Sequence, residues 1–200
     1  MSDTPRDTTP GIHHVTVGAA GPIEYYKDHI DRLDWLRRFV RILDRFGWTC
    51  LIVCQMTTHV HVIVDIPDRS LSDGMHRLNC GYGKEFNGRH GRFGHLVRRR
   101  FWSKRIRSGK QLVAAYRYVA LNPVRAGMCE RAEEWYWSSF ATSCGMATTF
   151  PFVDATSALA ALRASPADAS ASLLALVGDV QRRHVPWLPP DVFRLDAGSG

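Results

Sequence analysis

Residues 48–66 read WTCLIVCQMTTHVHVIVDI and carry most of the information about the fold. Two apolar and β-branched runs, 48–55 and 59–66, flank a three-residue connection, and Pro67 follows the second run. Runs of this length and composition are typical of neighbouring β-strands. Because side chains alternate along a strand, the three valines of the second run share one face, which we expect to be buried.

The segments on both sides of this pair alternate between strand and helix patterns. A short β-branched run at 12–17 precedes a helical pattern from Asp28 to Gly47, in which apolar residues recur at three- and four-residue steps. The later elements are expected to be a second helix opened by the capping pair Ser70 and Asp73, a strand near 97–102, a third helix from Ser108 to about Leu121, a turn at 122–127, and short helices at 155–163 and 169–183. The order β-α-β-β-α-β-α predicts an α+β fold of ferredoxin-like character, with helices packed on a sheet.

The length of 200 residues suits one domain with a short appendage. We expect a flexible tail at 1–10, a main domain at 11–153, and an Ala-rich helical extension with a loose end at 154–200. No apolar run approaches the roughly 18 residues of a membrane-spanning helix, and the polar N-terminus is not typical of a signal peptide. The five scattered cysteines form no CxxC and do not predict a disulfide framework. These features indicate a cytosolic protein.

Positive charge is concentrated in the middle of the chain. The whole chain has 26 Lys and Arg against 19 Asp and Glu, a net charge of +7, whereas residues 77–131 have 14 basic and two acidic side chains. That segment therefore has a net charge of +12 and the remainder −5. Taken alone, such a segment is a solvated arginine-rich face. Aromatic residues on which bases can stack are interleaved with it, and this favours a nucleic-acid partner.

The sharpest local feature is His59-Val60-His61. Both histidines point to the same face of a strand, where two imidazoles can bind one divalent ion. The ordinary interpretation of such a pair is two histidines on an exposed strand face. Two ligands are too few for a structural zinc site, and no cysteine pair completes the set. A half-open site that also accepts phosphate oxygens and water suits Mg²⁺ or Mn²⁺.

The third predicted helix carries a second candidate feature near its end. Tyr116 lies on the apolar stripe of this helix and is expected to pack in the core. Tyr118 and Asn122, four residues apart, share a different face. Tyr118 is therefore either a surface aromatic that covers a groove or a phenol nucleophile, with Asn122 supplying an oxygen beside the histidines.

With these features the chain resembles the single-tyrosine HUH transposases, and among them the REP-associated tyrosine transposases. Three motifs occur in the order of the family: MTTHVHVI at 56–63, YVALNPVRAG at 118–127 and WYWSSF at 135–140. The resemblance covers about residues 11–153, including His14-Val15-Thr16 near its start. The HxH motif is weak by itself, whereas its combination with the tyrosine-bearing helix end is specific.

The resemblance implies a role for each matching residue. His59 and His61 would be the metal-binding pair for Mg²⁺ or Mn²⁺, Asn122 the third ligand, and Tyr118 the nucleophile. Members of the family cut single-stranded DNA at the foot of imperfect hairpins and leave a 5′-phosphotyrosine and a free 3′-OH, so rejoining needs no ATP. The DNA backbone would be bound by the basic residues Arg98, Arg99, Arg100, Lys104, Arg105, Arg107 and Arg125. Trp102 is expected either to stack on unpaired bases or to pack in the core.

The chain departs from the family pattern at two places. Residues 18–21 read GAAG where the family commonly has an Arg-Gly-Asn-type segment, and Thr57-Thr58 replaces a Pro-Asn pair. Neither change removes a metal ligand or the nucleophile, so recognition of the guide sequence is affected more than the chemistry.

Three hypotheses follow. The first is a metal-dependent tyrosine DNA strand transferase, in the cytoplasm and associated with the nucleoid. The second is a non-catalytic protein that binds DNA hairpins and derives from such a transposase. The third is a zinc hydrolase built on the HxH motif, although it lacks an obvious third ligand and general base. The sequence leaves monomer and homodimer equally open.

Overall fold

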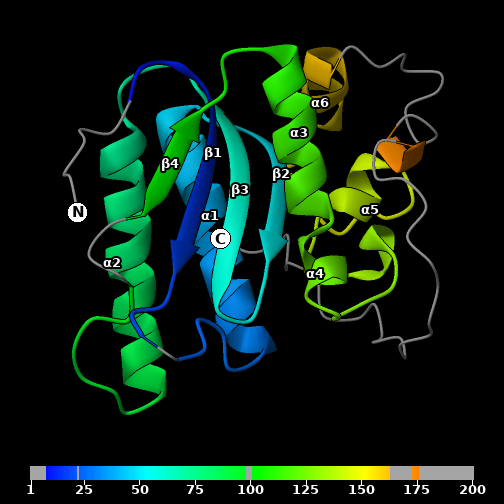
Figure 1. Cartoon of the computed structure of the whole chain (residues 1–200). Coiled ribbons are helices and arrows are strands. Elements are labelled where there is room, and N and C mark those ends of the chain that lie inside the picture. The colour runs from blue at the N-terminus through cyan, green and yellow to red at the C-terminus, as the bar shows by residue number, and fades with distance from the viewer. Residues whose placement is uncertain (1–7, 22, 98–100, 163–172, 176–200) are drawn as a thin grey trace, which may run out of the picture.

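The computed structural model describes residues 8–21, 23–97, 101–162 and 173–175 and confirms the α+β fold (Figure 1). Four strands form one antiparallel sheet in the order β2-β3-β1-β4. The strands are β1 (Gly11–Gly18), β2 (Thr49–Gln55), β3 (His59–Ile66) and β4 (Trp102–Arg105). Two helices, α1 (His29–Phe46) and α2 (Leu71–Arg89), complete the predicted β-α-β-β-α-β order.

The ends of α1 follow from the local sequence. The Asp28 carboxylate accepts a hydrogen bond of 2.9 Å from the backbone N–H of Asp31, which satisfies a free donor in the first turn. Gly47 ends the helix at φ 63°, a left-handed conformation that glycine adopts without strain. The helix predicted between these two residues is therefore confirmed.

The N-terminus of α2 differs from the prediction, because Ser70 and Asp73 do not form a capping pair. The side chain of Ser70 makes no hydrogen bond to the helix backbone. Its hydroxyl instead accepts a hydrogen bond of 2.9 Å from the indole N–H of Trp48, the residue before β2. The oxygen that the sequence pattern assigned to the helix cap therefore accepts a hydrogen bond from a residue outside the helix.

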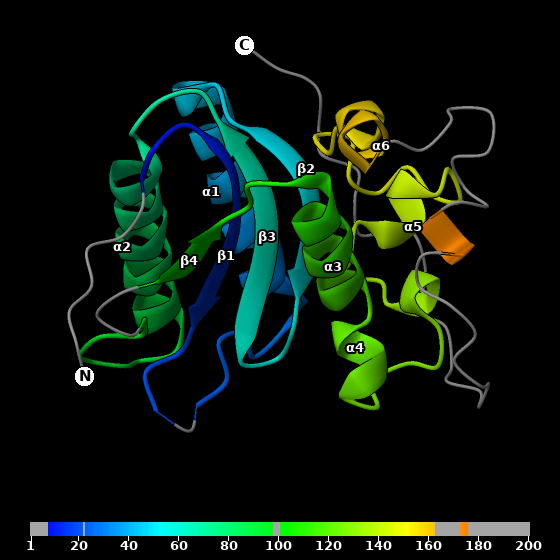
Figure 2. The same ribbon diagram turned by 45° about the horizontal axis from the view of Figure 1, so that its top comes forward.

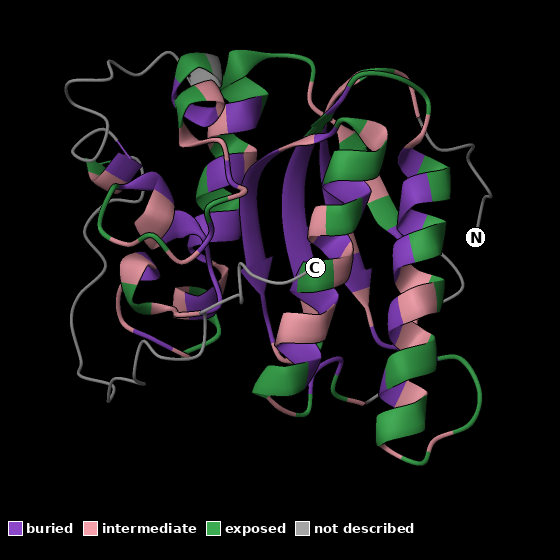
Figure 3. Cartoon of the chain, turned by 180° about the vertical axis from the view of Figure 1, so that it is seen from behind, coloured by how far each residue is buried: buried purple, intermediate pink, exposed green. Residues whose placement is uncertain are grey.

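The two faces of the sheet are covered differently. Helices α1 and α2 lie side by side behind the whole sheet, as the view from that side shows (Figure 3). The other face carries α3 (Gly109–Ala120), which packs on β2 and β3 (Figure 2). Short helices follow it: α4 (Asn122–Arg125), the 3₁₀ helix η1 (Ala132–Glu134), α5 (Phe140–Ser143) and α6 (Ala155–Leu162).

Two apolar cores fill the space on the two sides of the sheet. Val60, Val62 and Val64 of β3 pack with α1 and α2, as predicted. Ile63, from the opposite face of the same strand, packs with Tyr116 and other residues of α3. Since α3 packs on β2 and β3, part of this sheet face, toward β1 and β4, is open for a site.

The strand expected near 97–102 begins later, because only Trp102–Arg105 pairs with β1. Val97 makes an isolated bridge to Ala19, and residues 98–100 lie outside the described structure. The apolar residues that suggested the earlier position, such as Phe101, precede the pairing segment. An edge strand has one neighbour and tolerates the polar sequence WSKR, which an apolar pattern does not reveal.

Two further expectations concern the second half of the chain. The segment 122–127, expected as a turn, begins with the single helical turn α4 and closes with Gly127 at φ 67°. A helix at 155–162 agrees with the prediction, whereas most of 169–183 lies outside the described structure. No described helix combines the length and apolarity needed to cross a membrane. The proposed division of the chain at residues 153 and 154 stays a prediction.

Candidate active site

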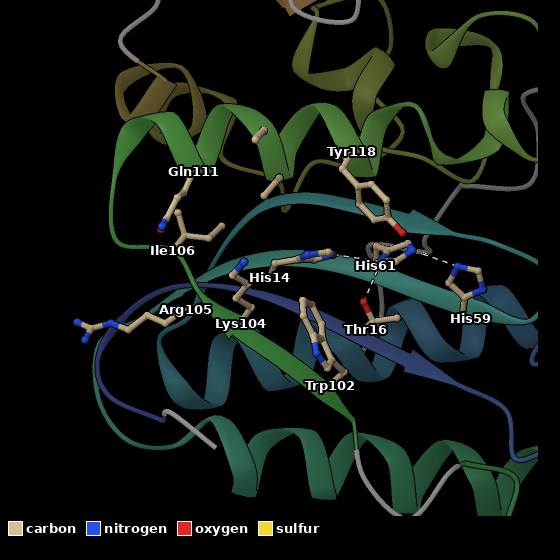
Figure 4. Close-up of a pocket in the computed structure, with 12 residues that line it drawn as sticks. His14, Thr16, His59, His61, Trp102, Lys104, Arg105, Ile106, Gln111 and Tyr118 are labelled. Carbon is tan, nitrogen blue, oxygen red and sulfur yellow. Dashed lines mark hydrogen bonds between the residues drawn. The ribbon is translucent and has the colours of Figure 1, made fainter. Parts of the chain in front are cut away.

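A cleft of about 590 Å³ lies between α3 and the open part of the sheet (Figure 4). It is lined from β1 by His14 and Thr16, from β3 by His59 and His61, from β4 and the residue after it by Trp102, Lys104, Arg105 and Ile106, and from α3 by Gln111, Ala114, Ala115 and Tyr118. The β1 and β3 residues are brought together by strand register, because Thr16 lies opposite His61. Four segments that are far apart in sequence therefore build one site.

Three imidazoles form a row at one end of the cleft. His61 lies in the middle, with its Nε2 3.0 Å from Nε2 of His59 and its Nδ1 3.1 Å from Nε2 of His14. Nδ1 of His61 also lies 2.9 Å from the hydroxyl of Thr16. At the outer end of the row, Nδ1 of His59 lies 3.0 Å from the hydroxyl of Thr58. Each of the two histidines predicted to bind metal thus has a hydroxyl partner on its Nδ1 side.

Burial keeps these imidazoles uncharged. Desolvation, followed by the charges of His59 and His14, lowers the pKa of His61 to about 3. Desolvation and the nearby Lys104 lower the pKa of His14 to about 4. The pKa of His59 is also lowered by desolvation. Neutral imidazole is the form that binds metal ions.

The hydrogen-bond partners also suit a cation between His59 and His61. If each Nδ1–H donates to its threonine hydroxyl, both Nε2 atoms carry lone pairs, and these face each other at 3.0 Å. Two facing lone pairs repel unless a cation or a proton lies between them. The donor set therefore fits a divalent ion bound through the two Nε2 atoms, with the threonines orienting the rings.

Tyr118 extends from α3 over the histidine row, and its hydroxyl points toward His61 in Figure 4. Its ring contacts the ring of His61 edge to face at a centroid distance of 5.4 Å, and that of His14 at 5.9 Å. Tyr118 is 43% exposed, so it is accessible from solvent. Tyr116, by contrast, is fully buried in the core, as the helical periodicity predicted.

Asn122 does not line the cleft in the described structure. Helix α3 ends at Ala120, and Asn122 begins the separate turn α4. Its side-chain amide donates a hydrogen bond of 3.5 Å to the backbone carbonyl of Tyr118. The structure therefore places the Asn122 amide next to the backbone of Tyr118, and its role as a third metal ligand stays a prediction.

The predicted DNA-binding residues take different positions. Lys104 and Arg105 line the cleft, although the guanidinium of Arg105 donates a hydrogen bond of 2.7 Å to the carbonyl of Pro10. The Arg125 guanidinium lies 5.5 Å from the centre of the Tyr118 ring, in a cation–π arrangement. The backbone N–H of Arg107 donates to the side-chain oxygen of Gln111 at 2.8 Å. Arg98, Arg99 and Arg100 lie outside the described residues.

Two cleft residues, His14 and Thr16, were missed by residue-level reasoning from the sequence. Their signal was the alternation of polar residues on one face of a strand that is otherwise apolar. That pattern gives no partner, because the pairing of β1 with β3 and its register exist only in the folded sheet.

A second group of potential metal ligands lies on the other side of the sheet. Asp28, Asp31 and His90 bring their ligand atoms within 4.8 Å of one another. Arg89 already forms ion pairs with both carboxylates, and Nε2 of His90 lies 3.0 Å from each oxygen of Asp31. These contacts join the start of α1 to the end of α2, so the group has a structural role.

Comparisons with known proteins agree with the resemblance seen in the sequence. No protein-family model matches the chain. A curated protein of Haemophilus influenzae, named as a REP-associated tyrosine transposase, is 24% identical over 156 residues, covering 70% of this chain and 86% of the relative. A solved structure of a REP-associated tyrosine transposase bound to a REP hairpin superposes with a TM-score of 0.62 at 18% identity, covering 78% of this chain and 90% of that chain. The chain is thus similar to REP-associated tyrosine transposases in sequence and in fold.

Proposed function

We propose that this chain is a DNA transposase of the single-tyrosine type, which cuts and rejoins hairpin-bearing single-stranded DNA. The observation that carries the proposal is the position of the Tyr118 hydroxyl above His61, beside the Nε2 pair of His59 and His61. The similarity to REP-associated tyrosine transposases supports the same activity. Its substrate is chromosomal DNA, so the protein acts in the cytoplasm at the nucleoid.

The proposed reaction is a transesterification at phosphorus. The Tyr118 oxygen attacks the scissile phosphate, a new O–P bond forms, and the bond from phosphorus to the 3′ oxygen breaks. The phenolic proton is lost and the leaving oxygen gains one, so the products are a 5′-phosphotyrosine and a 3′-OH. One phosphodiester is exchanged for another, and the reverse step rejoins DNA without a nucleotide cofactor.

Within this proposal His59 and His61 hold a divalent ion, Mg²⁺ or Mn²⁺. When bound, the ion supplies positive charge beside the phosphate and stabilises the charge that develops on its oxygens. Thr58 and Thr16 orient the two imidazoles, and burial keeps them uncharged and able to bind the metal. Asn122 would supply its side-chain oxygen as the third ligand, while its amide nitrogen donates to the carbonyl of Tyr118.

The DNA strand enters along the basic side of the cleft. Lys104 lies there, with Arg125 next to the tyrosine ring, and both are exposed. Contacts of this kind with phosphates weaken as salt rises, because binding releases counterions. We further propose that Arg98, Arg99, Arg100 and Arg107 extend this basic surface.

The proposal is tested by trapping the covalent intermediate. Labelled hairpins from repeats that flank the gene are incubated with Mg²⁺, Mn²⁺ or EDTA and run on a denaturing gel. The parent should give a metal-dependent protein–DNA adduct that Tyr118→Phe abolishes and Tyr116→Phe, two residues earlier on the same helix, retains. An adduct that persists in Tyr118→Phe contradicts the mechanism.

A second candidate function is binding of DNA hairpins without cleavage. It is favoured by the lining of the cleft, which includes His59 and His61 but not the third proposed ligand, Asn122. In this case the parent shifts hairpin DNA on a native gel in a salt-sensitive manner but gives no adduct with either metal.

A further inference from the structure

The cleft extends beyond the histidine row toward the edge of the sheet. Figure 4 shows Trp102 and Lys104 on β4 on one side of it, and Gln111 of α3 at the end remote from His59. Strand β4 is at the edge of the sheet, next to β1, with Trp102 opposite Thr16 and Lys104 opposite His14. Trp102 and Lys104 are two residues apart and therefore share one face of the strand.

Trp102 is one of the few large apolar side chains that the described structure leaves open to solvent. Its side chain is 50% exposed, and it contacts the ring of His14 at a centroid distance of 5.3 Å. A half-exposed indole contributes only part of the stabilisation that full burial would give, because the free energy of burial depends on the apolar area removed from water. A planar ligand stacked on the indole would remove the remaining area and add a stacking contribution.

The opposite wall of the cleft leaves space for such a ligand. Ala114 and Ala115 of α3 line the cleft there, while Leu112 and Tyr116 of the same helix point into the core. Methyl side chains are the smallest that still offer an apolar surface. A flat ring that enters here therefore meets the indole of Trp102 and the alanine methyl groups.

Positive charge lies beside this apolar space. Lys104 is exposed, lines the cleft and lies opposite His14 in the strand register. A ligand with one aromatic ring and one nearby anionic group fits the pair of Trp102 and Lys104. A nucleotide has both, and a base stacks on an aromatic side chain without regard to its sequence.

We propose that this end of the cleft binds one unpaired nucleotide, with its base stacked on Trp102 and its phosphate paired with Lys104. The proposal rests on the proposed function, because it places this nucleotide next to the phosphate that Tyr118 attacks. It adds to that function the two side chains that hold the nucleotide beside the cut. A base held in a duplex has its faces covered by its neighbours and does not stack on the indole.

The test uses fluorescein-labelled dT12, which contains no hairpin, in EDTA so that no cleavage occurs. Binding is measured by fluorescence anisotropy for the parent, Trp102→Ala, Trp102→Phe and Phe93→Ala. Phe93 is 97% exposed and does not line the cleft, so it is the matched aromatic control. Trp102→Ala should weaken binding by about 5- to 150-fold, the range for loss of one base stack. Trp102→Phe should recover most of this loss, and Phe93→Ala should bind within about twofold of the parent, as expected for a surface residue without a role.

Two further variants test the other walls of the subsite. Ala114→Leu fills the cleft from an exposed helix position and should weaken dT12 binding by about tenfold, as for loss of about 1.4 kcal/mol. Lys104→Gln should reduce the slope of log affinity against log salt by about 0.7, the value for one phosphate contact with a single strand. Affinities that equal the parent's in Trp102→Ala and Ala114→Leu overturn the proposal, as does a parent that does not bind dT12.

The outcome is separable from that of the proposed function, whose readout is the covalent adduct. If the parent forms no adduct but Trp102→Ala loses dT12 binding, the subsite stands and the cleavage mechanism fails. If the adduct forms and Trp102→Ala binds dT12 like the parent, the cleavage mechanism stands and the subsite fails.

Discussion

The two faces of strand β3 place alternate residues in opposite chemical environments. Val60, Val62 and Val64 face α1 and α2 and are enclosed by apolar side chains. His61, between them in sequence, is almost as buried at 4% exposed, but its partners are His14, His59 and Thr16. The face that two helices cover completely stabilises the fold. The face that α3 covers in part has buried polar groups next to an open cleft. These groups are held in place by the fold and can still contact a ligand in the cleft.

The largest expected effect is a loss of activity from a substitution on the open face that leaves the fold intact. His61→Asn removes an imidazole that the proposed ion needs and should lower adduct formation by about 10³-fold, as for loss of several kcal/mol of charge stabilisation. The measurement is the adduct yield over time with Mn²⁺. Circular dichroism should show an unchanged fold. Cleavage at the parent's rate would exclude His61 from the site.

A substitution on the face that α1 and α2 cover should instead lower the stability of the fold. Phe39 of α1 is fully buried against that core, so Phe39→Ala should lower the free energy of unfolding by about 3–5 kcal/mol. The exposed control Phe93→Ala should stay within about 0.5 kcal/mol of the parent. Urea denaturation measures both values. Equal stability of the two variants would contradict the description of this face as the stabilising core.

The buried imidazoles of the open face should make stability depend on pH. The pKa of His14 is about 4 and that of His61 about 3 in the folded chain, against an ordinary value of 6.5. The unfolded chain therefore binds more protons below pH 6.5, and the free energy of unfolding falls as pH is lowered from about 6.5 to about 4. Each histidine contributes up to about 1.4 kcal/mol per pH unit.

The contribution of one histidine to this slope is isolated by His14→Gln. Urea denaturation at several pH values in that range should give a slope smaller than the parent's by up to about 1.4 kcal/mol per pH unit, because one titrating group is lost. A slope identical to that of the parent would show that His14 keeps its ordinary pKa in the folded chain.

The smallest effect concerns the hydroxyl beside His61. Thr16→Val keeps the shape of the side chain but removes the oxygen that lies 2.9 Å from Nδ1 of His61. Loss of such an orienting partner should weaken Mn²⁺ binding by about 10-fold or more. Electron paramagnetic resonance titration without DNA measures it, with Thr49→Val on β2 as the control. Unchanged affinity would leave His14 alone to orient the ring.

Local sequence information was sufficient for most of the elements and for one half of the site. Asp28 and Gly47 are local signals of helix ends, and the alternation around His59 and His61 is a property of any strand. The position of β4 could not be obtained in this way, because an edge strand is defined by its pairing with β1 and not by its own apolar pattern. Ser70 shows the same limit, since a distant indole competes for its hydroxyl.

The sequence by itself determined the α+β order of elements, the shared face of His59 and His61, and the separation of a buried Tyr116 from an exposed Tyr118. These follow from the periodicities of strand and helix, which depend only on neighbours along the chain. The tertiary structure alone decided that His14 and Thr16 join His61, that Trp102 lines the same cleft as α3, and that Asn122 begins a separate turn after α3. Those placements depend on strand order, register and the end of α3, which are set by how distant segments pack against one another.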